Sequence, residues 1–135
     1  MNLPDLIDTF ELLDDWSEKY RTLIELGREL PPFPEDLKTA ENKVLGCQSQ
    51  VWVVSERDAE DPAIFRFRAD SDAHIVRGLV ALVLLMYDGK SATEIQALDP
   101  RETFAALGLD RHLSQGRTNG LLSMVGRIKR LAVVG

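Results

Sequence analysis

Cys47 is the side chain of this 135-residue chain that is best able to do chemistry, and it is the only cysteine. A thiolate is a strong nucleophile, although a lone cysteine is more often a small core residue. Its position indicates otherwise, because Gly46 precedes it and a predicted strand begins soon after it. A flexible glycine at such a loop-to-strand junction presents the next side chain to a partner. We therefore expect a presented thiol, with a core cysteine as the alternative.

Few other side chains offer a chemical partner for that thiol. His74 and His112 could lower its pKa, as the imidazole does in cysteine hydrolases, but several predicted helices separate them and favour structural or exposed roles. No Cys/His or His/carboxylate cluster has metal-site spacing, and the acidic residues at 58–61 and 70–72 lack the pattern of a calcium loop. The nine glycines are too dispersed for a phosphate-binding loop. We expect no metal and no bound cofactor.

Charge and hydropathy limit the partners of the chain. With 22 acidic against 16 basic side chains, the net charge of −6 repels nucleic acid and anionic membranes. The longest apolar run, residues 79–87, is far shorter than the roughly 20 residues that cross a bilayer. Asp5 and Asp8 stand where a secretory signal has a basic start, and a single cysteine suits a reducing compartment. We expect a cytoplasmic protein that binds a protein or a small molecule.

The elements that position Cys47 begin with two predicted helices and a loop. A short helical segment covers residues 4–13. Asp15 and Glu18 resemble a capping box that starts the second helix, and Gly27 offers a left-handed stop at its end. The apolar face of that helix is formed at helical spacing by Trp16, Tyr20, Leu23 and Ile24. Three prolines between residues 31 and 34 then predict a loop.

The middle of the chain predicts a hairpin and a buried helix. Residues 50–54 are rich in β-branched and aromatic side chains, residues 65–68 alternate apolar with basic, and polar residues 57–62 separate them. Residues 74–87 are apolar nearly all round, which indicates a central buried helix. The polar residues 70–72 before it are candidate caps, and Gly89 follows its end.

Three further helices are predicted in the last part of the chain. Ser91 to Glu94 form a capping box, Asp99 and Pro100 start a helix that ends before Gly108, and Ser114 or Thr118 caps the last helix. That helix has an apolar stripe of Leu121, Val125, Ile128 and Leu131 and a solvated basic face of Arg127, Lys129 and Arg130. Helices, a small antiparallel sheet and more helices predict an α+β fold in one domain over residues 1–135.

Residues 46–52, Gly-Cys-Gln-Ser-Gln-Val-Trp, resemble the signature of the SufE family of cysteine desulfuration proteins. Three further blocks resemble the family in the same order, within residues 20–31, 70–79 and 112–121. The resemblance covers nearly the whole chain. It implies an α+β fold related to the scaffold proteins of iron-sulfur assembly, in which helices flank a small antiparallel sheet.

The resemblance also implies a reaction. A PLP-dependent cysteine desulfurase holds sulfur as a persulfide and passes the outer sulfur to Cys47, which relays it toward an iron-sulfur scaffold. The PLP belongs to the desulfurase, so this chain acts as a carrier and activator and needs no cofactor. Arg117 resembles a family arginine at the cysteine site, and Asp72 a family aspartate near the cysteine loop. Gly46, Gln48, Ser49 and His112 are the implied partner-binding residues.

Purely structural roles for Arg117 and Asp72, and two other functions for the protein, remain as alternatives. Without the resemblance, Arg117 is a solvated helix arginine, and Asp72 also suits a helix cap. An iron-sulfur scaffold is opposed by the single cysteine, because clusters take several thiolates. A cysteine-dependent hydrolase or peroxidase needs a base paired with Cys47. We also hypothesise that the apolar neighbours Val44, Leu45, Val51 and Trp52 shelter a persulfide until a partner docks.

Overall fold

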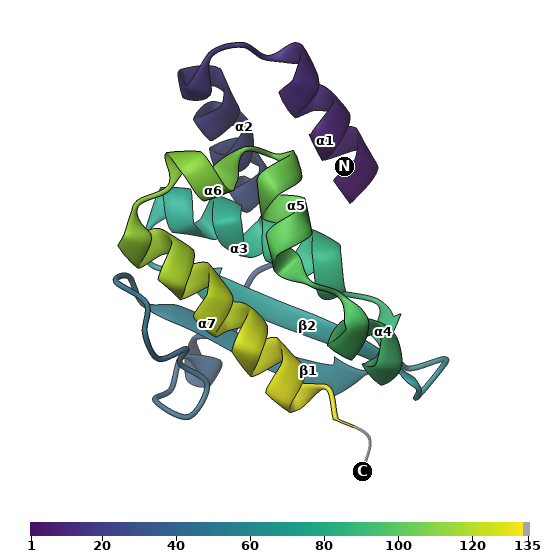
Figure 1. Ribbon diagram of the computed structural model, residues 1–135. Coiled ribbons are helices and arrows are strands. Elements are labelled where there is room, and N and C mark those ends of the chain that lie inside the picture. The colour runs from purple at the N-terminus through teal and green to yellow at the C-terminus, as the bar shows by residue number, and fades with distance from the viewer. Residues whose placement is uncertain (134–135) are drawn as a thin grey trace.

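The computed structural model describes residues 1–133 and contains helices packed around a small sheet (Figure 1). The elements in chain order are α1 (Leu3–Leu12), α2 (Trp16–Arg28), a 3-10 turn (Glu35–Leu37), β1 (Val51–Arg57), β2 (Ile64–Ser71), α3 (His74–Tyr87), β3 (Lys90–Ser91), α4 (Ala92–Ala97), α5 (Pro100–Ala106), α6 (Leu109–His112) and α7 (Gln115–Leu131). The predicted α+β class is confirmed.

The sheet is antiparallel, with strand order β1-β2-β3. Val51 of β1 pairs with Ser71 of β2 and Arg57 pairs with Phe65, so the predicted hairpin is present and extends beyond the residues expected from composition. The two-residue strand β3 pairs with the start of β2 and was not predicted. Two residues are too few to show the alternation that reveals a strand.

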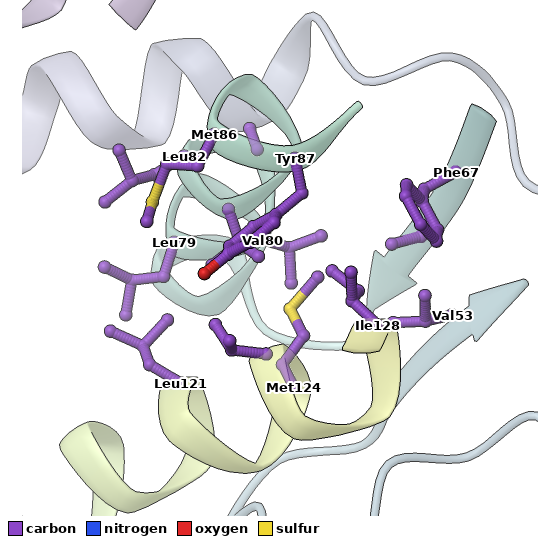
Figure 2. Close-up of a cluster of buried hydrophobic side chains, with 14 of the residues drawn as sticks. Val53, Phe67, Leu79, Val80, Leu82, Met86, Tyr87, Leu121, Met124 and Ile128 are labelled. Atoms are coloured by element: carbon purple, nitrogen blue, oxygen red, sulfur yellow. The ribbon is translucent and has the colours of Figure 1, made fainter. Parts of the chain in front are cut away.

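The core lies between the inner face of the sheet and the helices α3 and α7. Figure 2 shows Val53 and Phe67 of the two long strands on the side of α3 and α7 where Val80, Tyr87, Met124 and Ile128 lie. Most of α3 is buried from Gly78 onward, which confirms the predicted central helix. The helix α7, yellow-green in Figure 1, crosses over this face of the sheet and buries the predicted stripe.

Local signals placed most helix starts correctly. Ser91 and Glu94 form both halves of the capping box, Asp99 caps α5 through the Arg101 N–H, and Ser114 rather than Thr118 caps α7. Asp15 caps α2 by accepting from the Ser17 N–H. Gly108 has φ +75, in the left-handed region that favours glycine, as expected of a residue beyond a helix end.

The expectation for Gly27 was wrong. The helix α2 continues through Gly27 to Arg28, and Gly27 instead allows α2 to approach α3. A Cβ at Gly27 would lie 2.6 Å from the backbone nitrogen of Gly78, so a larger residue does not fit. Glycine here provides close helix packing, which a single helix pattern does not reveal.

Two polar assignments also change. The N-cap of α3 is Ala73, with no side-chain capping bond, because Asp70 pairs with Arg77 and Lys38 while Asp72 turns to Gln50. Arg127 does not lie on a purely solvated face. Its guanidinium donates two hydrogen bonds, of 3.0 and 2.8 Å, to the Val53 carbonyl of β1 and so ties α7 to the sheet.

Within residues 1–133, no helix combines the length and apolar character that crossing a membrane requires.

Candidate thiol site at Cys47

The site is built on a closed loop, here called the cysteine loop, of residues 45–50. The chain before it runs antiparallel to β1: the Val44 N–H donates to the Val51 carbonyl at 2.8 Å, and the Val53 N–H donates to the Asn42 carbonyl at 3.0 Å. At the other end, the Gln50 N–H donates to the Asp72 carboxylate at 3.1 Å, and the Asp72 N–H donates to the Gln50 carbonyl. Both ends of the loop are therefore fixed by hydrogen bonds.

One face of α7 supports the cysteine loop. A Cβ at Gly116 would overlap the Gln48 side chain, and a Cβ at Gly120 would lie 3.4 Å from the Cys47 sulfur. Gly46 has φ +89, and a Cβ there would lie 2.8 Å from the Ser123 hydroxyl. Small residues at helical spacing thus let the loop rest directly on the helix.

Cys47 is half-buried in this position. Its Sγ lies 3.5 Å from the Gly120 carbonyl oxygen, to which the thiol donates a weak hydrogen bond. Burial raises the pKa of the Cys47 thiol above its ordinary value, because desolvation disfavours the thiolate. Burial therefore favours the protonated, less reactive form of the thiol.

A cavity of about 60 Å³ adjoins Cys47. Its apolar lining comes from three elements: Val51 of β1, Val76, Leu79 and Val80 of α3, and Leu121 and Met124 of α7. Gln48 and Arg117 are exposed and also line it, so they lie at its rim. Of the four neighbours expected to shelter a persulfide, only Val51 contributes. Leu45 is 80% exposed, and the shelter comes from α3 and α7 instead.

The structure brings together most of the residues predicted for the site. Gln48, Ser49 and Arg117 line the cavity with Cys47, Gly46 supports the loop against α7, and Asp72 fixes the end of the loop. Gly116, Gly120 and Ser123 complete the support and were not singled out. Glycine disfavours a helix interior by about 1 kcal/mol relative to alanine, so Gly116 and Gly120, four residues apart in a helix, were the available signal.

His112 lies elsewhere. Its ring stacks on Trp16 with 3.9 Å between ring centroids, its Nδ1 lies 3.0 Å from the Gly108 carbonyl, and its own carbonyl accepts from the Tyr20 hydroxyl. It does not line the cavity. His74 is exposed at the start of α3. Among the residues that the structure describes, the hydrogen-bond partner of the Cys47 sulfur is a backbone carbonyl and not an imidazole or carboxylate.

Arg117 occupies an unusual place for an arginine. It stands in the first turn of α7, where its N–H donates to the Ser114 cap. A cation at a helix N-terminus gains nothing from the helix dipole. In residues 1–133 its guanidinium takes part in no ion pair. The helix itself therefore gives no reason for this charge beside the cavity.

The described residues also contain no group of three or more His, Cys, Asp or Glu side chains placed to hold a metal ion. The fold and the site thus define an α+β protein with one half-buried thiol. The thiol is carried on a fixed loop that rests on a helix, and it adjoins a small apolar cavity.

Comparisons with known proteins assign this arrangement to a family. The family model described as the SufE Fe-S metabolism associated domain matches residues 4–132. An uncharacterized SufE-like protein of Rhizobium etli is 55% identical, over 98% of this chain and 90% of its own length. A second, of Rhizobium meliloti, is 53% identical over 95% of this chain and 92% of its own length. The chain belongs to the SufE family, whose domain is associated with iron-sulfur metabolism.

A solved structure has a similar fold. The solution structure of a hypothetical protein from Thermus thermophilus superposes with a TM-score of 0.75, over 96% of this chain and 92% of that chain. The two sequences are only 19% identical, so this likeness concerns the fold.

Proposed function

We propose that this protein accepts sulfur on Cys47 from a PLP-dependent cysteine desulfurase and relays it toward iron-sulfur cluster assembly. The observation that carries the proposal is the placement of the only thiol. It lies on a fixed loop at the mouth of an apolar cavity, within reach of an approaching protein and half-shielded from water. Membership of a family associated with iron-sulfur metabolism agrees with this role.

The transfer is a thiol exchange. The Cys47 thiolate attacks the outer sulfur of the persulfide on the desulfurase cysteine. A sulfur-sulfur bond forms on Cys47, the sulfur-sulfur bond on the enzyme breaks, and the enzyme cysteine leaves as a thiolate that takes up one proton. No oxidant, reductant or cofactor of this chain is needed, so it acts as carrier and activator rather than as an enzyme.

The cavity suits the product of that step. A water-sized atom needs roughly 10–15 Å³ of such space, so a cavity of about 60 Å³ accommodates the outer sulfur of a Cys47 persulfide. Its apolar walls limit the approach of small thiols, which would reduce the persulfide, and of oxidants, which would oxidise it.

The other predicted residues support the same step. The raised pKa of Cys47 means that the free protein carries little thiolate, and the Arg117 cation at the cavity rim stabilises the thiolate or pairs with a partner carboxylate when the complex forms. Asp72 fixes the loop, while Gly46, Gln48 and Ser49 meet the partner. His112 is exposed on α6 and stays a predicted partner contact at the margin of the interface. The reaction takes place in the cytoplasm.

The rival functions have less support. A cluster scaffold would need more than one thiolate, and a hydrolase or peroxidase would need a base beside Cys47. The test is the turnover of the desulfurase with free cysteine as substrate. Wild-type protein should accelerate it and Cys47→Ser should not, although both bind. Full acceleration by Cys47→Ser would refute the acceptor mechanism.

A further inference from the structure

Leu45, two residues before Cys47, is 80% exposed. The other large apolar side chains with high exposure in the described part of the chain are Met1, Leu12 and Val133, of which two lie near a chain end and one at the end of α1. Leu45 is the one that stands beside the thiol. A single exposed leucine is ordinary on a protein surface, so its surroundings decide whether it has a role.

The backbone holds Leu45 outward. The preceding residue, Val44, is 2% exposed and hydrogen-bonded to β1, while the following residue, Gly46, has φ +89 and rests against Ser123. Leu45 and Gly46 form the turn between these two anchors. The exposure of Leu45 therefore belongs to a fixed turn and is not that of a loose chain end.

Beside Leu45 a groove runs along the outer side of α7. Leu45 lines it together with Leu122, Ser123 and Arg130. The helix α7 carries four basic side chains and no acidic one, in a chain whose net charge is −6. Arg127 donates to Val53 and Lys129 donates to Gln96, whereas Arg130 is exposed and lines the groove. Leu45 is thus an apolar projection that shares its groove with an exposed cation.

We propose that Leu45 and this groove form the docking anchor for the desulfurase, which offers an apolar pocket with a carboxylate at its rim. The inference rests on the proposed function, because sulfur transfer brings the enzyme persulfide into bonding distance of Cys47. The enzyme surface around its cysteine then covers the turn only two residues away. Burial of Leu45 stabilises the complex, and the exposed Arg130 pairs with that carboxylate and speeds the encounter.

The test measures the concentration of this protein that gives half-maximal sulfur loading of Cys47 by the desulfurase. Leu45→Asp should raise that concentration about thirtyfold or more, the effect size of an interface hot spot, and Leu45→Ala should raise it less. Leu12→Asp is the matched control, because Leu12 is 84% exposed on α1 and should change nothing. Loading at saturation should stay at the wild-type level, since Leu45 takes no part in the exchange.

Inorganic polysulfide, a small sulfur donor, separates docking from thiol chemistry. It should load Cys47 equally in wild type, Leu45→Ala and Leu45→Asp. Equal loading also shows that the cysteine loop is intact in the variants. If Leu45→Asp does not fold, the comparison of Leu45→Ala with wild type tests the docking role. If the desulfurase loads the wild-type protein and the Leu45 variants have the same half-maximal concentration, the docking role of Leu45 is refuted but the proposed function is not. Absence of wild-type loading would instead overturn the proposed function. Self-association of the free protein that Leu45→Asp abolishes would assign the surface to a second copy and also overturn the anchor.

Discussion

At the scale of single residues, the half-buried position of Cys47 lowers the reactivity of its thiol. The raised pKa means that the folded protein binds the thiol proton more firmly than the unfolded chain does. The contribution of this group to the free energy of unfolding is constant below the unfolded pKa. It decreases as the pH rises from that value to the folded pKa.

We expect iodoacetamide to alkylate Cys47 of the native protein several times more slowly than Cys47 of the urea-unfolded chain near neutral pH. The reason is that only the thiolate reacts, and burial reduces both its fraction and its access. The rate should rise with pH beyond the point at which an exposed cysteine levels off. Equal rates for native and unfolded protein would contradict a sheltered thiol.

Arg117→Ala should fold normally and weaken activation of the desulfurase. Losing an exposed arginine changes the free energy of unfolding by less than about 0.5 kcal/mol, whereas losing a charge-assisted contact costs about 1.5 to 3 kcal/mol of transition-state or complex stability. Arg21→Ala, an exposed arginine on α2, serves as the control. If both variants activate as well as wild type, Arg117 is only a solvated helix residue.

Physical chemistry alone predicts a role for Cys47, whereas the roles of Arg117 and Asp72 were predicted only from the family resemblance. Cys47 follows from being the only thiol beside a glycine. The predictions for Arg117 and Asp72 came from the family resemblance, because nothing in local spacing says that Arg117 lines the cavity beside Cys47 or that Asp72 fixes the end of the cysteine loop. Chain distance likewise gave no indication that His112 stacks on Trp16.

At the scale of elements, α7 supports the cysteine loop. Gly116 and Gly120 give up helix propensity so that Gln48 and Cys47 can lie against the helix backbone. The helix starts that the sequence predicted correctly depend on residues close together in the chain, such as the Ser91 capping box and the Ser114 cap. Gly27 as a helix stop and Asp72 as a helix cap were wrong predictions, because the roles of both residues depend on the elements that pack against them.

Gly120→Val should expose Cys47. A Cβ at residue 120 already lies 3.4 Å from the sulfur, so a branched side chain displaces the thiol from its support. We expect faster alkylation of Cys47 and faster loss of a bound persulfide to reducing thiols. Gly126→Val, on the same helix and facing only the far end of the Arg130 side chain, should leave both rates unchanged. Identical behaviour of the two variants would show that α7 does not shelter the thiol.

At the scale of the whole molecule, the site depends on the complete fold. Its cavity is lined by the cysteine loop, β1, α3 and α7, which come from separate parts of the chain. The order of elements was enough to predict the α+β class, because apolar periodicity and caps are local. The cavity and the groove beside Leu45 are tertiary features, and no pattern in the sequence outlines them.

Mass spectrometry of the intact protein tests whether Cys47 carries the transferred sulfur. After mixing with the desulfurase, PLP and free cysteine, the wild-type chain should gain the mass of one sulfur atom, located on the peptide that contains Cys47, and a reducing thiol should remove it. Cys47→Ser should gain nothing, because a hydroxyl is too poor a nucleophile for the exchange. A wild-type chain that accelerates the desulfurase without acquiring a reducible sulfur on Cys47 would contradict the account.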